Sequence, residues 1–107
     1  MGCLTVADLG ELELVERILD KLTPFNGSVQ IGPGDDAAVL GIGGSVVLTT
    51  DSQHEGIHYS AEWISPEMLG RRSIAVNASD LGAMGARPRG FLVALALPAT
   101  TQLDWVV

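Results

Sequence analysis

Carboxylates occur at three separated places in the chain, each beside residues typical of a strand end or a helix. Asp35 and Asp36 stand together in IGPGDDAAVL, Asp51 follows the run VVLTT, and Asp80 lies in SIAVNASDLGAM. Adjacent carboxylates repel each other, and a cation that neutralises them removes that cost. Magnesium prefers hard oxygen ligands and usually shares them with water and substrate phosphates. The pattern therefore predicts a magnesium site built from the oxygens of Asp35, Thr49, Thr50, Asp51 and Asp80.

Simpler interpretations of the same residues stay open. Adjacent aspartates in a glycine-rich turn often serve only turn geometry, and the Thr-Thr-Asp run at 49–51 also fits an ordinary strand end followed by a loop. Asn77 and Asp80 are three residues apart and share a helix face, which also fits a solvated stripe. The apolar neighbours of Asp80 favour instead a charge that is paired or ligated.

Other site chemistries have less support. One cysteine and two scattered histidines give no ligand spacing for zinc. His54 and His58 lie in a polar loop without an evident partner, as surface histidines do. The GIGG stretch lacks the GxxxxGK[ST] pattern of a phosphate-binding loop and predicts a hairpin turn. No serine, cysteine or lysine stands in a context that would activate it, so no catalytic nucleophile is expected.

The overall charge argues against some classes of function. The chain has 107 residues, 13 acidic and 6 basic side chains, and a formal net charge of -7. A nucleic-acid-binding domain needs a basic face to replace counterions, which this chain lacks. A divalent cation would still let an acidic domain bind a phosphate compound. The single Cys3 precludes an internal disulfide and suits a reducing cytoplasm, and no apolar run reaches the ~18 residues of a membrane helix.

Two helices are predicted to position the candidate ligands. Apolar residues recur at helical spacing over residues 5–22. Asp8 resembles the start of a capping box, and Thr5 is an alternative cap. Ser65-Pro66-Glu67 has a cap residue, a proline and an acid in the order that helix starts favour. The second helix is expected to run from about residue 66 to 84.

Four strands are predicted, which makes the domain α/β. Short runs over 28–32, 37–40 and 46–50 fit strands, and glycines join the last two as a turn. The run FLVALAL at 91–97 is apolar throughout. Such a run predicts a strand buried on both faces.

The chain is expected to form a single N-terminal domain, residues 1–107, of a longer protein. Its length suits one small domain. Thr101 to Asp104 resembles a helix start, yet the sequence ends at Val107, after barely one turn. A helix that has only nucleated has not recovered its entropic cost, which favours a C-terminal domain beyond this sequence.

Taken together, the motifs resemble one family. The stretches LGELELVERI, GDDAAVL, LTTDSQHEGIHY and NASDLGAMGARPRGFLVALALP are similar, in order and spacing, to the N-terminal domain of thiamine-monophosphate kinases. These enzymes are part of the aminoimidazole ribonucleotide synthetase-like superfamily. GDDAAV and TTD also occur in other members of that superfamily, whereas EGIHY and NASDLGAMGA favour the thiamine enzymes. The resemblance covers nearly the whole chain.

The resemblance implies a fold and a reaction. The fold would be α/β with a mixed or antiparallel sheet, helices on one face, and strands that pair with a second subunit in a dimeric barrel. The reaction would be ATP-dependent phosphorylation of thiamine monophosphate to thiamine diphosphate, by direct in-line transfer assisted by Mg²⁺. The partners would be ATP, thiamine monophosphate and a second copy of the chain, in the cytoplasm, with no nucleic acid and no membrane.

The resemblance also implies roles for particular residues. Asp35 of GDD, the run Thr49, Thr50 and Asp51 of TTD, and Asp80 of NASD would be magnesium ligands. His58 of EGIHY would contact the thiamine substrate. Asp36 and Asn77 would hold the ligands in place without touching the metal.

Two other interpretations stay open. The chain could be the N-terminal domain of another ATP-using enzyme of the superfamily, such as the hydrogenase maturation factor or selenophosphate synthetase. It could also be a metal-binding and dimerisation module without catalysis. The family's later glycine-glycine-aspartate motif and its C-terminal domain are absent from this sequence. The chain alone is therefore expected to have little or no kinase activity.

Overall fold

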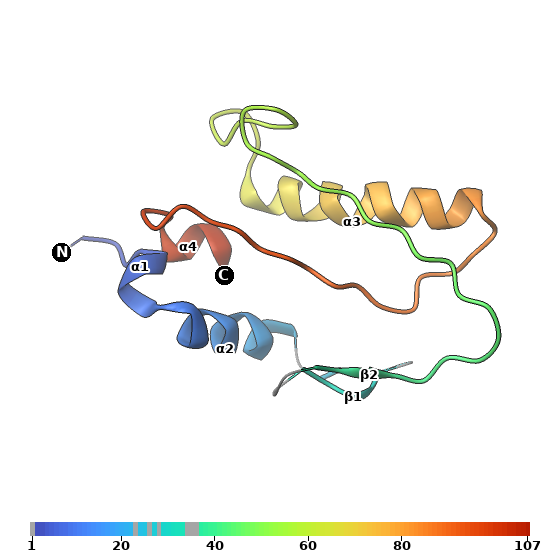
Figure 1. The fold of residues 1–107 in the computed structure, drawn as a ribbon. Helices are drawn as coiled ribbons and strands as arrows, with labels where there is room; N and C mark the ends of the chain where they lie inside the picture. Colours follow the sequence, from blue (N-terminus) through green and yellow to red (C-terminus); the bar gives the residue numbers. More distant parts are fainter. Residues whose placement is uncertain (1, 23, 26, 28, 34–36) are drawn as a thin grey trace. The chain divides into compact units, whose positions relative to one another are not determined.

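The computed structural model of the chain describes residues 2–22, 24–25, 27, 29–33 and 37–107. The chain divides into two units. We call Met1–Gly41 with Gly90–Val107 the terminal unit, and Ile42–Arg89 the central unit. Each unit is described by itself, with the elements labelled as in Figure 1.

The first helical stretch of the terminal unit is interrupted. α1 (Val6–Leu9) and α2 (Glu11–Leu22) are separated by Gly10. Gly10 has a φ of +78°, a left-handed conformation that glycine adopts without steric cost. The prediction of a helix over 5–22 is therefore correct in type but wrong in continuity, because Gly10 leaves the helical conformation.

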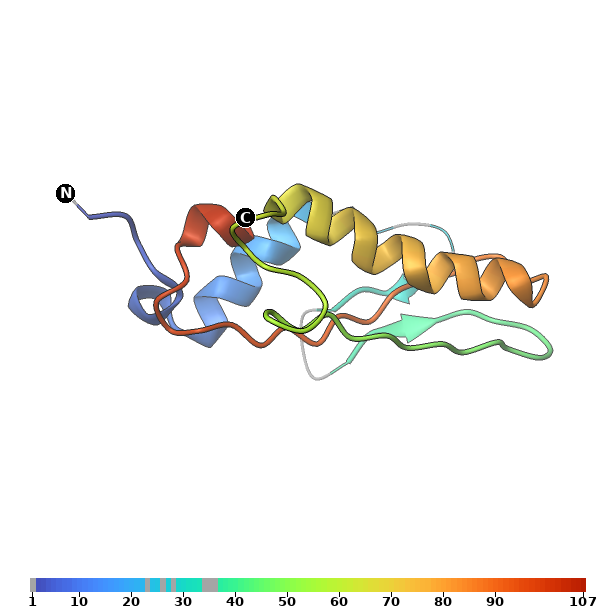
Figure 2. The same cartoon turned by 90° about the horizontal axis from the view of Figure 1, so that it is seen from above.

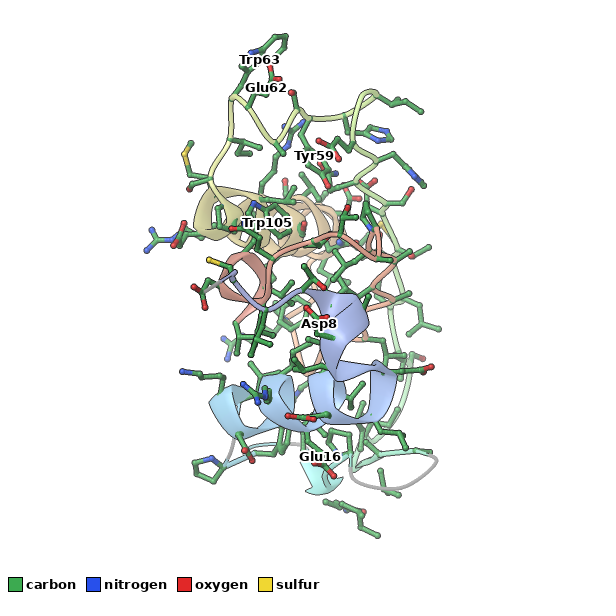
Figure 3. The ribbon with its side chains drawn as sticks, turned by 90° about the vertical axis from the view of Figure 1, so that its left-hand side faces the viewer. Asp8, Glu16, Tyr59, Glu62, Trp63 and Trp105 are labelled. Atoms are coloured by element: carbon green, nitrogen blue, oxygen red, sulfur yellow. The ribbon has the colours of Figure 1, made fainter. Side chains whose placement is uncertain are left out.

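Thr5, which the sequence offered as an alternative to Asp8, is the cap residue of α1. The backbone N–H of Thr5 donates to Asp8 Oδ2 at 2.8 Å, and the Thr5 hydroxyl donates to the same oxygen at 2.7 Å (Figure 3). The backbone bond, followed by the hydroxyl bond, lowers the pKa of Asp8 below its ordinary value. Asp8 therefore lies in the first turn and stabilises the helix start from within, as the acid of a capping box does.

The C-terminal segment supplies hydrogen-bond partners to the start of α1. The N–H groups of Val6 and Ala7 donate to the carbonyls of Thr101 and Ala99, at 2.8 and 3.1 Å. The first N–H groups of a helix have no partner within that helix. These bonds therefore satisfy two such donors and join the two ends of the terminal unit.

The start of α4 (Leu103–Val106) donates in turn to a carbonyl of the N-terminal segment. The Leu103 N–H donates to the Leu4 carbonyl at 2.8 Å, and Gln102, rather than Thr101, is the cap residue of this helix. Leu103 and Leu14 of α2 are the two buried hydrophobic residues in the described part of the chain. The small core of the terminal unit therefore depends on one leucine from each end of the chain.

One small sheet completes the terminal unit. β1 (Val29–Ile31) and β2 (Val39–Leu40) pair antiparallel, with Val29 opposite Leu40 and Ile31 opposite Val39. The register is irregular between these two pairs. The strand expected over 28–32 is confirmed in type, and the strand expected over 37–40 is shorter than predicted.

Two predicted strands do not form. Residues 46–50 and 91–97 are extended segments without ladder pairing in the described part of the chain (Figures 1 and 2). Leu48 is 88% exposed and Leu92 is 97% exposed. The prediction of a strand at 91–97 buried on both faces is therefore wrong for this chain by itself. A strand requires a neighbour that accepts and donates its backbone hydrogen bonds, and no described residue takes that place.

The central unit contains the longest helix, α3 (Pro66–Ala83). The Met68 N–H donates to Ser65 Oγ at 3.2 Å, which satisfies one free donor of the first turn, and Pro66 occupies a position where an N–H is not needed. The helix predicted over about 66–84 is confirmed. No helix in the described residues is both long and apolar enough to cross a membrane.

Candidate functional site

Polar side chains form a ladder along α3, within the central unit. The Ser73 hydroxyl donates to the Leu69 carbonyl at 2.8 Å, and the Asn77 amide donates to the Ser73 carbonyl at 2.9 Å. The second bond fixes which atom of the Asn77 amide is the oxygen. Asn77 Oδ1 is left buried without a hydrogen-bond partner in the described part of the chain. A buried acceptor without a donor is costly, so this atom is suited to a donor that a ligand or water would supply.

Asp80 of α3, three residues after Asn77, contacts the extended segment of the same unit. The Thr49 hydroxyl donates to Asp80 Oδ2 at 3.4 Å, across 31 positions of sequence. This distance exceeds the ~2.5–3.0 Å usual for a hydroxyl donor, so the bond is weak. Asp80 is exposed and Thr49 is half-buried. The arrangement brings a hydroxyl and a carboxylate from the TTD and NASD motifs side by side, with most of the acceptor capacity of the carboxylate still free.

The other predicted ligands are placed differently. Thr50 and Asp51 are exposed, and the described residues show no hydrogen bond from the Thr50 hydroxyl to Asp80. Asp35 and Asp36 lie outside the described residues. In the part that the structure describes, no group of three or more histidines, cysteines, aspartates or glutamates could hold a metal ion.

The donor chemistry nevertheless suits magnesium better than a softer metal. The neighbouring atoms at this place are hydroxyl and carboxylate oxygens, on Thr49 and Asp80. Hard oxygen ligands are those that Mg²⁺ takes from proteins, and it commonly binds through one or two carboxylates and completes its shell with water and phosphate oxygens. These two residues therefore fit a partial magnesium site.

The two histidines, predicted to lack partners, contact each other. The His54 backbone N–H donates to His58 Nδ1 at 2.9 Å, and the two ring centroids are 5.6 Å apart at 39°. The chain turns back between the two histidines, and the turn ends at Tyr59, which is labelled in Figure 3. The Tyr59 carbonyl accepts from the Gly56 N–H at 2.7 Å. Gly56 has a φ of +80°, which explains the glycine at the turn.

Sequence reasoning missed His54 as a contact of His58. The available signal was the separation of four residues around a glycine in a polar loop, which permits a tight turn but does not require one. It also missed Gln53, whose Oε1 is buried without a hydrogen-bond partner among the described residues. Nothing in the residue type of Gln53 distinguishes it from an exposed loop glutamine.

Comparisons with known proteins identify the family. The family described as AIR synthase related protein, N-terminal domain, matches residues 34–107. The chain is 47% identical to the thiamine-monophosphate kinase of Synechococcus elongatus over 104 residues, which are 95% of this chain and 30% of the relative. It is 39% identical to that of Mycobacterium tuberculosis over 99 residues, 91% of this chain and 29% of the relative.

A further relative shows a similar level of identity. The chain is 38% identical to the thiamine-monophosphate kinase of Escherichia coli K12 over 91 residues, 83% of this chain and 28% of the relative. It spans about three-tenths of the length of these curated relatives. No solved structure gives a significant match. Because the family match covers well over half of the residues, the chain belongs to the AIR synthase related proteins and carries their N-terminal domain.

Proposed function

We propose that the chain is the N-terminal part of an enzyme that transfers phosphate from ATP to thiamine monophosphate, giving thiamine diphosphate. The observation that carries this proposal is the similarity to proteins named thiamine-monophosphate kinase, at 38–47% identity over 83–95% of the chain in the relatives compared above. The reaction would take place in the cytoplasm, which the single cysteine suits.

The metal-binding part of the proposal assigns ligands by chemistry. Thr49 and Asp80 would bind Mg²⁺ together with Asp35, Thr50 and Asp51, and Asp36 and Asn77 would hold these ligands in place. The hydrogen bond of Thr49 to Asp80 supports this assignment, since it joins two of the motifs. When bound, magnesium would neutralise negative charge on the phosphates of ATP.

The chain's own residues would bind and orient the substrates. A phosphoryl transfer of this kind needs positioning and charge stabilisation rather than a protein nucleophile. Asp80 would keep its carboxylate available, because its one hydroxyl contact is long. His58 would contact thiamine monophosphate from the exposed loop that precedes α3.

A homodimer is the second part of the proposal. The segment 91–97 exposes apolar side chains, with Leu92 97% and Val93 79% exposed, and it has no ladder partner in the described part of the chain. A second copy would supply strands that cover these side chains and take up the backbone hydrogen bonds. The pairing of strands in a dimeric barrel would remove this exposed apolar surface.

Calorimetric titration of the purified chain with a non-hydrolysable ATP analogue tests the proposal. We expect binding with Mg²⁺ and none with a chelator, together with little turnover of thiamine monophosphate. Asp80→Asn should weaken magnesium-dependent binding about tenfold or more, the size of a lost charge-assisted contact. Asp104→Asn, the same exchange at an exposed site of α4, is the matched control.

The outcomes separate the alternatives. Nucleotide binding that does not depend on magnesium, or that Asp80→Asn leaves unchanged, would contradict the metal assignment. Metal binding without any nucleotide binding would favour a metal-binding and dimerisation module. Nucleotide binding without any effect of added thiamine monophosphate would favour another ATP-using enzyme of the superfamily.

A further inference from the structure

The segment His54–Tyr59, which we call the histidine turn, is held by a set of short backbone bonds. The His58 N–H donates to the His54 carbonyl at 2.8 Å, and the Gly56 N–H donates to the Tyr59 carbonyl at 2.7 Å. The Ile57 N–H also donates to the His54 carbonyl, at 3.2 Å. The backbone around His58 is therefore fixed at both ends of the turn, although its side chain is exposed.

One bond of the histidine turn determines which nitrogen of His58 carries the proton. The His54 backbone N–H lies 2.9 Å from His58 Nδ1, and a backbone N–H can only donate. Nδ1 must therefore present its lone pair, and the proton of the neutral imidazole must lie on Nε2. The imidazole ring of His54 also lies beside that of His58, with the ring centroids 5.6 Å apart at 39°.

We propose that His58 meets its ligand as a hydrogen-bond donor through Nε2–H, and that His54 is the positioning residue that fixes this tautomer through its backbone and this orientation through its ring. A role as a metal ligand or general base would need the lone pair on Nε2, and in this turn the lone pair lies on Nδ1. The ligand atom must then be an acceptor. The assignment of this acceptor atom to thiamine monophosphate rests on the proposed function, whereas the assignment of the His58 tautomer rests only on the hydrogen bond from His54.

The tautomer is tested by long-range proton–nitrogen NMR spectra of the ¹⁵N-labelled chain, at a pH where both imidazoles are neutral. The chain has two histidines, so His54→Ala assigns the signals directly. We expect the Nε2–H pattern for His58 in the parent. The same pattern should persist in His54→Ala, because alanine keeps the backbone N–H while it removes the ring contact.

Two results would overturn the tautomer assignment. An Nδ1–H pattern, or an average of both tautomers, in the parent would show that the backbone bond does not control the ring. A change of tautomer in His54→Ala would show that the imidazole of His54, rather than its amide, fixes the proton. Both results are independent of any kinase activity.

The donor role is tested with two substitutions of His58, one that can keep the acceptor at the Nδ1 position and one that can keep the donor at the Nε2 position. The side chain of His58→Asn has an oxygen near the Nδ1 position and can keep the turn bond, but has no group at the Nε2 position. The side chain of His58→Gln has an amide N–H near the Nε2 position and can keep the outward donor. Thiamine monophosphate is the probe, and unphosphorylated thiamine shows whether the acceptor lies on the phosphate.

We expect His58→Asn to lose about tenfold in affinity for thiamine monophosphate, the size of one lost hydrogen bond to a charged or buried acceptor. His58→Gln should recover part of that loss, and the NMR spectra of both variants report whether the turn is intact. Recovery by asparagine rather than glutamine would overturn the donor role. A chain that binds no thiamine monophosphate would remove the ligand assignment, while the tautomer would still be decided by the spectra.

Discussion

The substitution Leu103→Ala tests whether the terminal unit depends on the contact between its two ends. Leu103 is 7% exposed and begins α4, where its N–H also bonds to the Leu4 carbonyl. Alanine keeps that backbone bond and removes about three methylene equivalents, worth roughly 0.8 kcal/mol each, or about 2.4 kcal/mol in transfer free energy. The cavity left at this buried position adds to this, so we expect a loss of about 3 kcal/mol in the free energy of unfolding.

Urea denaturation followed by circular dichroism measures this loss. A loss of about 3 kcal/mol is large against the roughly 5–15 kcal/mol by which native domains are stable. The matched control is Leu92→Ala, the same exchange in the same unit at a side chain that is 97% exposed. At low protein concentration we expect that control to change the free energy of unfolding by less than about 0.5 kcal/mol.

The comparison of the two variants can refute the reasoning in two ways. A loss below about 1 kcal/mol for Leu103→Ala would show that the two ends of the chain are not joined by a common core. A large loss for Leu92→Ala at low concentration would show that this side chain is buried within one copy of the chain. A loss for Leu92→Ala that grows with protein concentration would instead support a second copy covering residues 91–97.

Three further outcomes are expected. Because hydrogen bonds lower the pKa of Asp8 from its ordinary value of 3.8, Asp8→Asn should be less stable than the parent above pH 3.8. The two should converge as the pH falls through the lowered pKa, and a difference that persists in acid would contradict the cap. Ser65→Ala should cost about 1 kcal/mol in urea denaturation, and Ser65→Asp should restore it, because either oxygen can cap α3. Thr49→Val should cost about 0.5 kcal/mol or less, since its bond to Asp80 is long. The same change should weaken magnesium-dependent nucleotide binding measured by calorimetry, and unchanged binding would remove Thr49 from the ligand set.

The helix α3 was predictable because its signals are local. Ser65 and Pro66 specify the start within a few residues of the bond that Ser65 makes to the Met68 N–H. The family was also predictable, because the order and spacing of short motifs are properties of the sequence itself. In contrast, the anchoring of α1 on residues 99–101 depends on a segment about ninety positions away.

In the candidate site, too, the residue types could be read from the sequence, whereas the contacts between distant residues could not. The residue types alone indicated that Asp80 and Thr49 offer hard oxygens, but only the folded central unit brings them to 3.4 Å. The pairing of His54 with His58 needed the turn geometry, since two exposed histidines four residues apart have many other arrangements available.

What the sequence by itself determined is therefore the helix α3 and the helical character of residues 5–22, the chemistry that the side chains offer, and the family. Hydrogen bonds within a helix join residues four positions apart, and side-chain caps such as Ser65 act over three, so a local pattern contains these partners. The tertiary structure alone decided that the apolar segments at 46–50 and 91–97 have no ladder partner among the described residues. The hydrogen bonds of a strand come from another segment or another chain, and an apolar run does not specify which one.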